Sequence, residues 1–120
     1  MKLDLVIYVQ ELEKMKKFYQ YVFGFIVKEV VYSKKSSNHI MLIKDDLELV
    51  LIEKNTLSPV SSTLKPIFII DEPMAVCRKR TKLHGGSFSA KSKEWLYEDF
   101  QVCDGADMEG NVFQVRCKKN

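Results

Sequence analysis

The sequence has few of the residues that hold metal ions or form cross-links, with two histidines and three cysteines in 120 residues. The cysteines are Cys77, Cys103 and Cys117. Their number is odd, no two form a CxxC pair, and no histidine stands near them at zinc-finger spacing. We therefore expect small, reduced core residues in a cytoplasmic protein. A nucleophilic Cys103 is an open alternative, although no neighbour in the sequence would lower its pKa.

Long apolar runs are absent as well. No stretch approaches the ~18–20 apolar residues of a membrane span. Asp4 lies inside the first apolar run, which argues against a signal peptide. The net charge of +3 arises from short basic runs spread along the chain, and dispersed charge favours solubility over nucleic-acid binding. We expect a cytoplasmic protein that binds neither nucleic acid nor membranes.

The first half of the chain combines strand and helix patterns. Residues 3–9 are almost all apolar, which predicts a strand covered on both faces. Residues 11–22 carry apolar side chains at helical spacing, and Gly24 stands where this helix should end. Three strands bounded by polar turns follow: residues 25–32, 38–44 and 47–53. Residues 55–64 are rich in serine and threonine and contain a proline, which indicates a linker.

The same order of elements restarts after the linker. Residues 67–70 predict a strand, and residues 74–83 predict a helix that begins after a proline. An offset of 61 residues carries Gly24 onto Gly85, where the second helix should end. Three further extended segments are predicted: residues 88–91, 95–103 and 111–118.

These patterns predict an α+β domain built from two tandem βαβββ modules. The single domain would span residues 1–120, with module one at 1–54, the linker at 55–64 and module two at 65–120. One module of about 55–60 residues buries too little surface to be stable alone. We therefore expect the two modules to share a core, with the helices on one side of each sheet.

Four short motifs carry a family resemblance: Leu12-Glu13-Lys14, Phe18-Tyr19, Phe23-Gly24-Phe25 and Asp107-Met108-Glu109-Gly110-Asn111. With the tandem modules, they make the chain similar to the vicinal oxygen chelate superfamily. This superfamily includes glyoxalase I, bleomycin and fosfomycin resistance proteins and extradiol dioxygenases. The resemblance implies two curled sheets with helices outside, which form a cup around a small-molecule ligand. It also implies a homodimer.

Metal-dependent members of this superfamily place their ligands on the first and last strands of each module. The resemblance puts these four positions on Asp4, Glu48, Lys65 and Gln114, none of which is histidine. A lysine ammonium repels a divalent ion, and transition metals require imidazole or several carboxylates. We therefore expect no metal cofactor. If a divalent metal does bind, the implied ligands are Asp4, Glu48 and Gln114.

The favoured hypothesis is a metal-free protein that binds a small molecule in the cup. In it, Lys65 would take the place of the metal's charge and pair with Asp4 and Glu48. Exposed aromatics and convergent polar groups are typical of such pockets. The candidate ligand-binding residues are Asp4, Tyr8, Glu48, Lys65, Trp95, Tyr97, Gln114 and Arg116. For the aromatic members, packing within the sheet core is an equally good interpretation.

The alternative is an enzyme of lyase, isomerase or dioxygenase type. Either a hard cation such as Mg²⁺ or Mn²⁺ would bind Asp4, Glu48 and Gln114, or Glu48 would be catalytic as a general base without metal. A third hypothesis is a cup that serves only assembly.

Overall fold

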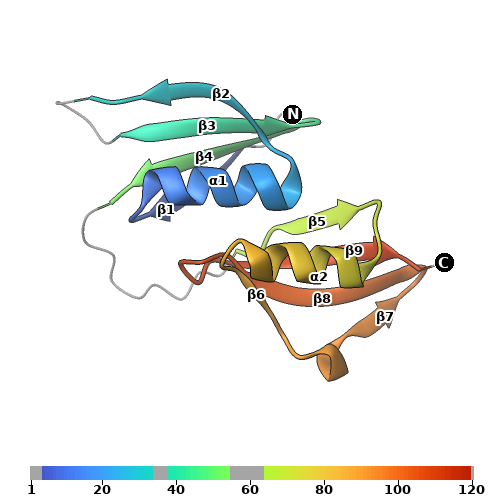
Figure 1. Cartoon of the computed structure of the whole chain (residues 1–120). Coiled ribbons are helices and arrows are strands. Elements are labelled where there is room, and N and C mark those ends of the chain that lie inside the picture. Colours follow the sequence, from blue (N-terminus) through green and yellow to red (C-terminus); the bar gives the residue numbers. More distant parts are fainter. Residues whose placement is uncertain (1–3, 34–37, 55–63, 120) are drawn as a thin grey trace. The chain divides into compact units, whose positions relative to one another are not determined.

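The computed structural model describes three segments of the chain: residues 4–33, 38–54 and 64–119. Internal contacts divide the chain into two compact units, Met1–Val60 and Ser61–Asn120. In each unit, one helix lies against one face of a mixed sheet (Figure 1). This confirms the predicted α+β fold class. The interval predicted as a linker, residues 55–64, lies outside the described residues apart from Leu64.

The first unit has the predicted order of one strand, one helix and three strands. Its elements are β1 (Asp4–Val9), α1 (Leu12–Phe23), β2 (Ile26–Val31), β3 (His39–Lys44) and β4 (Leu47–Glu53). β4 pairs in parallel with β1 and antiparallel with β3, so the sheet order is β1-β4-β3-β2. The boundaries of these elements agree with the predicted ranges to within one residue.

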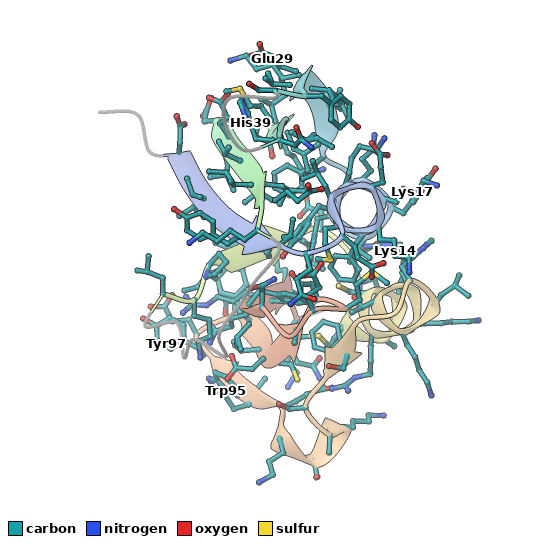
Figure 2. All side chains as sticks on the ribbon, turned by 90° about the vertical axis from the view of Figure 1, so that its left-hand side faces the viewer. Lys14, Lys17, Glu29, His39, Trp95 and Tyr97 are labelled. Atoms are coloured by element: carbon teal, nitrogen blue, oxygen red, sulfur yellow. The ribbon has the colours of Figure 1, made fainter. Side chains whose placement is uncertain are left out.

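α1 packs on its sheet through an apolar stripe at helical spacing. The buried side chains of the stripe are Leu12, Met15, Phe18, Tyr19, Val22 and Phe23. The helix ends at Gly24, whose φ of 76° is left-handed and therefore suits a residue without a Cβ. Lys14 and Lys17 lie on the outer side of the helix (Figure 2).

The second unit differs from the prediction in its middle. Its elements are β5 (Ile67–Ile70), α2 (Met74–Leu83), β6 (Ser87–Phe88), the 3₁₀ helix η1 (Lys91–Lys93), β7 (Trp95–Tyr97), β8 (Phe100–Ala106) and β9 (Val112–Lys118). The sheet order is β5-β9-β8-β6, and β7 also pairs with β8. Neither α1 nor α2, nor any other described helix, is long and apolar enough to cross a membrane.

Two predicted strands of the second unit were wrong. The segment 95–103 is not one strand but a hairpin of β7 and β8, because Glu98 adopts a left-handed φ of 53° and reverses the chain. The segment 88–91 contains only the end of the short β6, and Lys91 already belongs to η1.

The turn before β9 is held by the side chain of Asp107. Its Oδ1 accepts hydrogen bonds from the backbone N–H groups of Glu109 and Asn111, each at 2.9 Å. Its Oδ2 accepts a bond from the Asn111 Nδ2, also at 2.9 Å. Gly110 has a φ of 87°, which a turn glycine adopts without strain. These contacts fix where β9 begins, and with it which side chains of β9 face the helix.

The core of the second unit is an aromatic cluster between α2 and the sheet. The ring of Phe113 on β9 lies 5.9 Å from that of Phe68 on β5 and 5.7 Å from that of Phe88 on β6. Gly105 on β8 lies directly beneath this cluster. A Cβ on Gly105 would come within 2.8 Å of a Phe113 ring carbon and 2.8 Å of the Ser87 carbonyl oxygen.

We predict that Gly105→Ala lowers the free energy of unfolding by about 1–3 kcal/mol, because an added methyl group overpacks this contact. Urea unfolding followed by circular dichroism measures the change. Ser87→Ala, which alters an exposed side chain on the neighbouring strand, is the control and should change the value by less than about 0.5 kcal/mol. Equal stability of Gly105→Ala and the natural chain would show that β6 moves away from β8 without cost.

Candidate functional site

Each sheet has a second face, opposite its helix, that carries the candidate residues. In β4, Leu49 and Leu51 are fully buried, while Glu48 alternates with them and takes the other face. In β9, Phe113 and Val115 are buried toward α2, while Gln114 and Arg116 take the other face. Glu48, Gln114 and Arg116 therefore lie on the faces of their sheets that are opposite the helices.

In the first unit, the structure brings Asp4 and Glu48 side by side. They are directly opposite each other in the parallel pairing of β1 and β4. Asp4 is exposed, whereas Glu48 is only 3% exposed. Tyr8 lies on the same face of β1 but opposite Ile52, further along the strand. Its half-exposed ring has the Nζ of Lys54 4.1 Å from its centroid, a cation–π contact.

The buried Glu48 carboxylate is neutralised by a residue that the sequence analysis missed. The Nζ of Lys28 lies 3.2 Å from the Glu48 Oε1. Lys28 stands at an irregularity in β2, where the pairing with β3 shifts between Val27 and Glu29. A bulge of this kind adds one residue to the strand and re-aims its side chain. A single-sequence pattern of period two gives no signal for such a shift.

In the second unit, four polar side chains form a continuous chain across the sheet. The Lys65 ammonium lies 3.1 Å from the Asp104 carboxylate, and the Gln114 Nε2 donates a 3.2 Å hydrogen bond to the Asp104 Oδ1. The Arg116 Nε donates to the Gln114 Oε1 at 3.0 Å. The Arg116 guanidinium carbon lies 4.8 Å from the centroid of the Tyr97 ring.

Asp104 at the centre of this chain was not among the predicted site residues. It stands directly opposite Gln114 in the antiparallel pairing of β8 and β9. The sequence did not predict that Asp104 faces Gln114, because the hairpin at Glu98 was not predicted. Without that hairpin the pairing register of β8 with β9 could not be assigned. Lys65, Gln114, Arg116 and Tyr97 were predicted, and the structure brings them together.

The structure gives Lys65 and Glu48 charge partners within their own units. Lys65 pairs with Asp104, and Glu48 pairs with Lys28. The predicted pairing of Lys65 with Asp4 and Glu48 would join the two units and stays a prediction.

The aromatic candidates of the second unit lie on the open side of its sheet. Figure 2 shows Trp95 and Tyr97 on the side of the sheet away from α2. Trp95 is 42% exposed and Tyr97 is 49% exposed. The alternative of full burial in the sheet core is therefore wrong for both residues.

Within the described segments, no group of three or more histidine, cysteine, aspartate and glutamate side chains is arranged to hold a metal ion. The two histidines do not change this. His39 is half-buried in β3, and His84 caps the C-terminal end of α2. Of the positions implied as metal ligands, Glu48 and Gln114 have a cationic side chain in direct contact with a donor oxygen. Their present contacts therefore suit positive side chains better than a metal ion.

The sequence matches the family model of the Glyoxalase/Bleomycin resistance protein/Dioxygenase superfamily over residues 3–110. The chain belongs to this superfamily. The resemblance carried by the four short motifs is thereby confirmed. No curated protein matches the sequence.

Solved structures of this superfamily share the fold. The fosfomycin resistance protein FosX from Listeria monocytogenes, in complex with Mn(II) and sulfate, is 16% identical, with a TM-score of 0.79. The match covers 99% of this chain and 93% of that chain. A glyoxalase/bleomycin resistance protein from Albidiferax ferrireducens is 14% identical, with a TM-score of 0.71 and 96% of each chain covered. At these identities the likeness shows the fold alone.

The three cysteines are free and buried, as expected of core residues. Burial raises the pKa of Cys77 to about 11 and that of Cys117 to about 12. Burial also raises the pKa of Cys103, and the nearby Arg78 guanidinium only partly opposes this. All three thiols are therefore protonated at neutral pH, which disfavours Cys103 as a nucleophile.

We predict that none of the three thiols reacts rapidly with Ellman's reagent in the folded protein at pH 7, and that all three react after unfolding in guanidinium. Absorbance of the released thiolate measures both states. The pKa values of the buried thiols are higher in the folded protein than in the unfolded chain. The buried thiols therefore contribute fully to the free energy of unfolding below the ordinary cysteine pKa, and this contribution is lost as pH rises toward 12. Rapid labelling of one thiol that Cys103→Ala abolishes would contradict the prediction.

Proposed function

We propose that the protein binds a small molecule on the open faces of its sheets and does so without a transition metal. The observation that supports this most directly is the engagement of Gln114. Its amide donates to Asp104 and accepts from Arg116, so both ends of the side chain already have partners. An oxygen that accepts from a guanidinium is a poor ligand for a divalent cation.

Charge repulsion adds to this argument. At an effective dielectric constant of about 20, two unit charges about 4 Å apart interact by about 4 kcal/mol, and a divalent ion doubles the value. A metal ion at Glu48 would have to displace Lys28, and one at Gln114 would have to displace Arg116.

FosX carries Mn(II) in its solved structure, so a divalent metal does occur within the superfamily.

The binding residues that we propose are the predicted set with two additions, Lys28 and Asp104. Asp4, Tyr8, Lys28 and Glu48 belong to the first unit, and the remaining residues belong to the second. We further propose that residues 1–120 act as one domain, with a linker at 55–64 between the modules, and that the protein is a cytoplasmic homodimer.

A second candidate function is an enzyme that uses Glu48 as a general base. The observation in its favour is a carboxylate that is 3% exposed and lies 3.2 Å from an ammonium group. Burial and a charged partner are the means by which enzymes poise a carboxylate for proton transfer. A metal-dependent enzyme with Asp4, Glu48 and Gln114 as ligands is the remaining alternative.

We predict that the protein purified without chelators contains manganese, zinc, nickel and iron only far below one ion per chain. Inductively coupled plasma mass spectrometry measures the metal content. Glu48→Gln and Gln114→Glu are the informative variants. The first removes the negative charge of a possible metal ligand, and the second places a carboxylate at position 114. The first variant should leave the metal content unchanged.

One bound ion per chain that Glu48→Gln abolishes would overturn the metal-free proposal and favour the metal-dependent enzyme. Ligand binding is tested separately by thermal shift, since a ligand of the native state raises the melting temperature in a saturable way. A library in which no compound gives such a rise would favour a cup that serves assembly alone.

A further inference from the structure

Arg116 is held in one orientation from two sides. Its Nε donates to the Gln114 Oε1, and its guanidinium plane lies over the Tyr97 ring, with 4.8 Å from its carbon to the ring centroid. The Gln114 amide is itself held by the Asp104 carboxylate. An arginine fixed in this way loses little conformational freedom when it binds a ligand, because the cost of ordering it is already met within the unit.

The binding end of this arginine is unused. Among the residues of the described segments, none accepts a hydrogen bond from either terminal nitrogen of Arg116. The residue is only partly covered. Two terminal N–H groups in one plane match the two oxygens of a carboxylate, and such bidentate pairs are among the strong hydrogen bonds of proteins.

Two exposed aromatic residues, Trp95 and Tyr97, stand on the same face of the sheet as Arg116. Trp95 and Arg116 both stand directly opposite Val102, one on each side of it in the sheet. Val102 is fully buried. Trp95 and Tyr97 nevertheless keep 42% and 49% of their surfaces exposed. Exposed aromatic rings beside a fixed cation suit a ligand that has a planar body and an anionic end.

The charges of the network define the ligand's charge. Lys65 and Arg116 are positive and Asp104 is negative, so the linked groups carry one net positive charge. A single carboxylate would balance it, whereas a dianion would leave one uncompensated negative charge at the site. The structure therefore favours a monoanion over a doubly charged phosphate or phosphonate.

We propose that the open face of the second sheet binds an aromatic monocarboxylate, with the carboxylate on Arg116 and the ring against Trp95 and Tyr97. This inference rests on the proposed small-molecule function and specifies its ligand class. Lys65 and Asp104 act as positioning residues, since Lys65 holds Asp104, Asp104 holds Gln114, and Gln114 in turn holds Arg116. No covalent step is involved.

Trp95 is the sole tryptophan of the sequence and therefore reports on this face directly. The experiment titrates the full chain with phenylacetate and follows tryptophan fluorescence excited at the red edge, where phenylacetate does not absorb. Phenylacetamide is the uncharged control, and phenylphosphonate tests the dianion. We expect a saturable change with phenylacetate and weaker binding of both other compounds.

Arg116→Gln should raise the dissociation constant for phenylacetate by about tenfold or more, because the variant loses a charged hydrogen bond. Arg116→Lys keeps the charge but lacks the two coplanar N–H groups of the guanidinium, so it should recover only part of the affinity. Lys79→Gln removes an equal charge from the exposed side of α2 and should leave the affinity unchanged. Tyr97→Leu removes the ring and also one of the two contacts that hold Arg116, so it should weaken phenylacetate more than phenylacetamide.

Equal affinity for phenylacetate and phenylacetamide, or an Arg116→Gln effect no larger than that of Lys79→Gln, would overturn the anion site. Tighter binding of phenylphosphonate would overturn the assignment to a monocarboxylate. The proposal of a carboxylate ligand can fail while the proposed small-molecule function stands. If neutral or cationic aromatics bind while phenylacetate does not, the protein is a binder of another ligand class. If no compound of any charge gives a saturable change, both proposals fall.

Discussion

The hydrogen-bonded amide of Gln114 is the constraint on which the candidate site depends. It is nearly buried, at 6% exposure, and a buried amide must satisfy both its donor and its acceptor. Asp104 accepts from one end and Arg116 donates to the other. In this orientation the amide oxygen of Gln114 faces the guanidinium of Arg116. Asp104 therefore fixes the orientation of the amide, and the amide fixes that of the guanidinium. The amide thus supports the arginine on the open face of the second sheet.

The first unit shows a related substitution of charge. Glu48 on β4 is a metal-ligand position only as the family resemblance implies, and its carboxylate is in contact with the Lys28 ammonium. In both units a positive side chain from the same unit therefore contacts a residue that the family resemblance implies as a metal ligand. The fold is shared, but membership of the superfamily does not by itself assign an activity.

The errors of the sequence analysis share one physical cause, the local irregularity of strands. Trp95 and Tyr97 alternate correctly, but a left-handed Glu98 turns the chain, and glutamate gives no signal for a positive φ. Lys28 reaches Glu48 only because β2 shifts its register. A strand pattern predicts faces, whereas turns and bulges decide which residues of two strands become neighbours.

The sequence by itself determined the α+β class, the order of the elements in the first unit, and the superfamily. The periodicity of apolar residues and the spacing of motifs are local properties, so they can be read from the sequence without knowledge of the packing. Only the tertiary structure decided that Lys65 meets Asp104, that Lys28 meets Glu48, and that Arg116 lies over Tyr97. These contacts join residues distant in the chain, and their geometry depends on strand register, which no local pattern encodes.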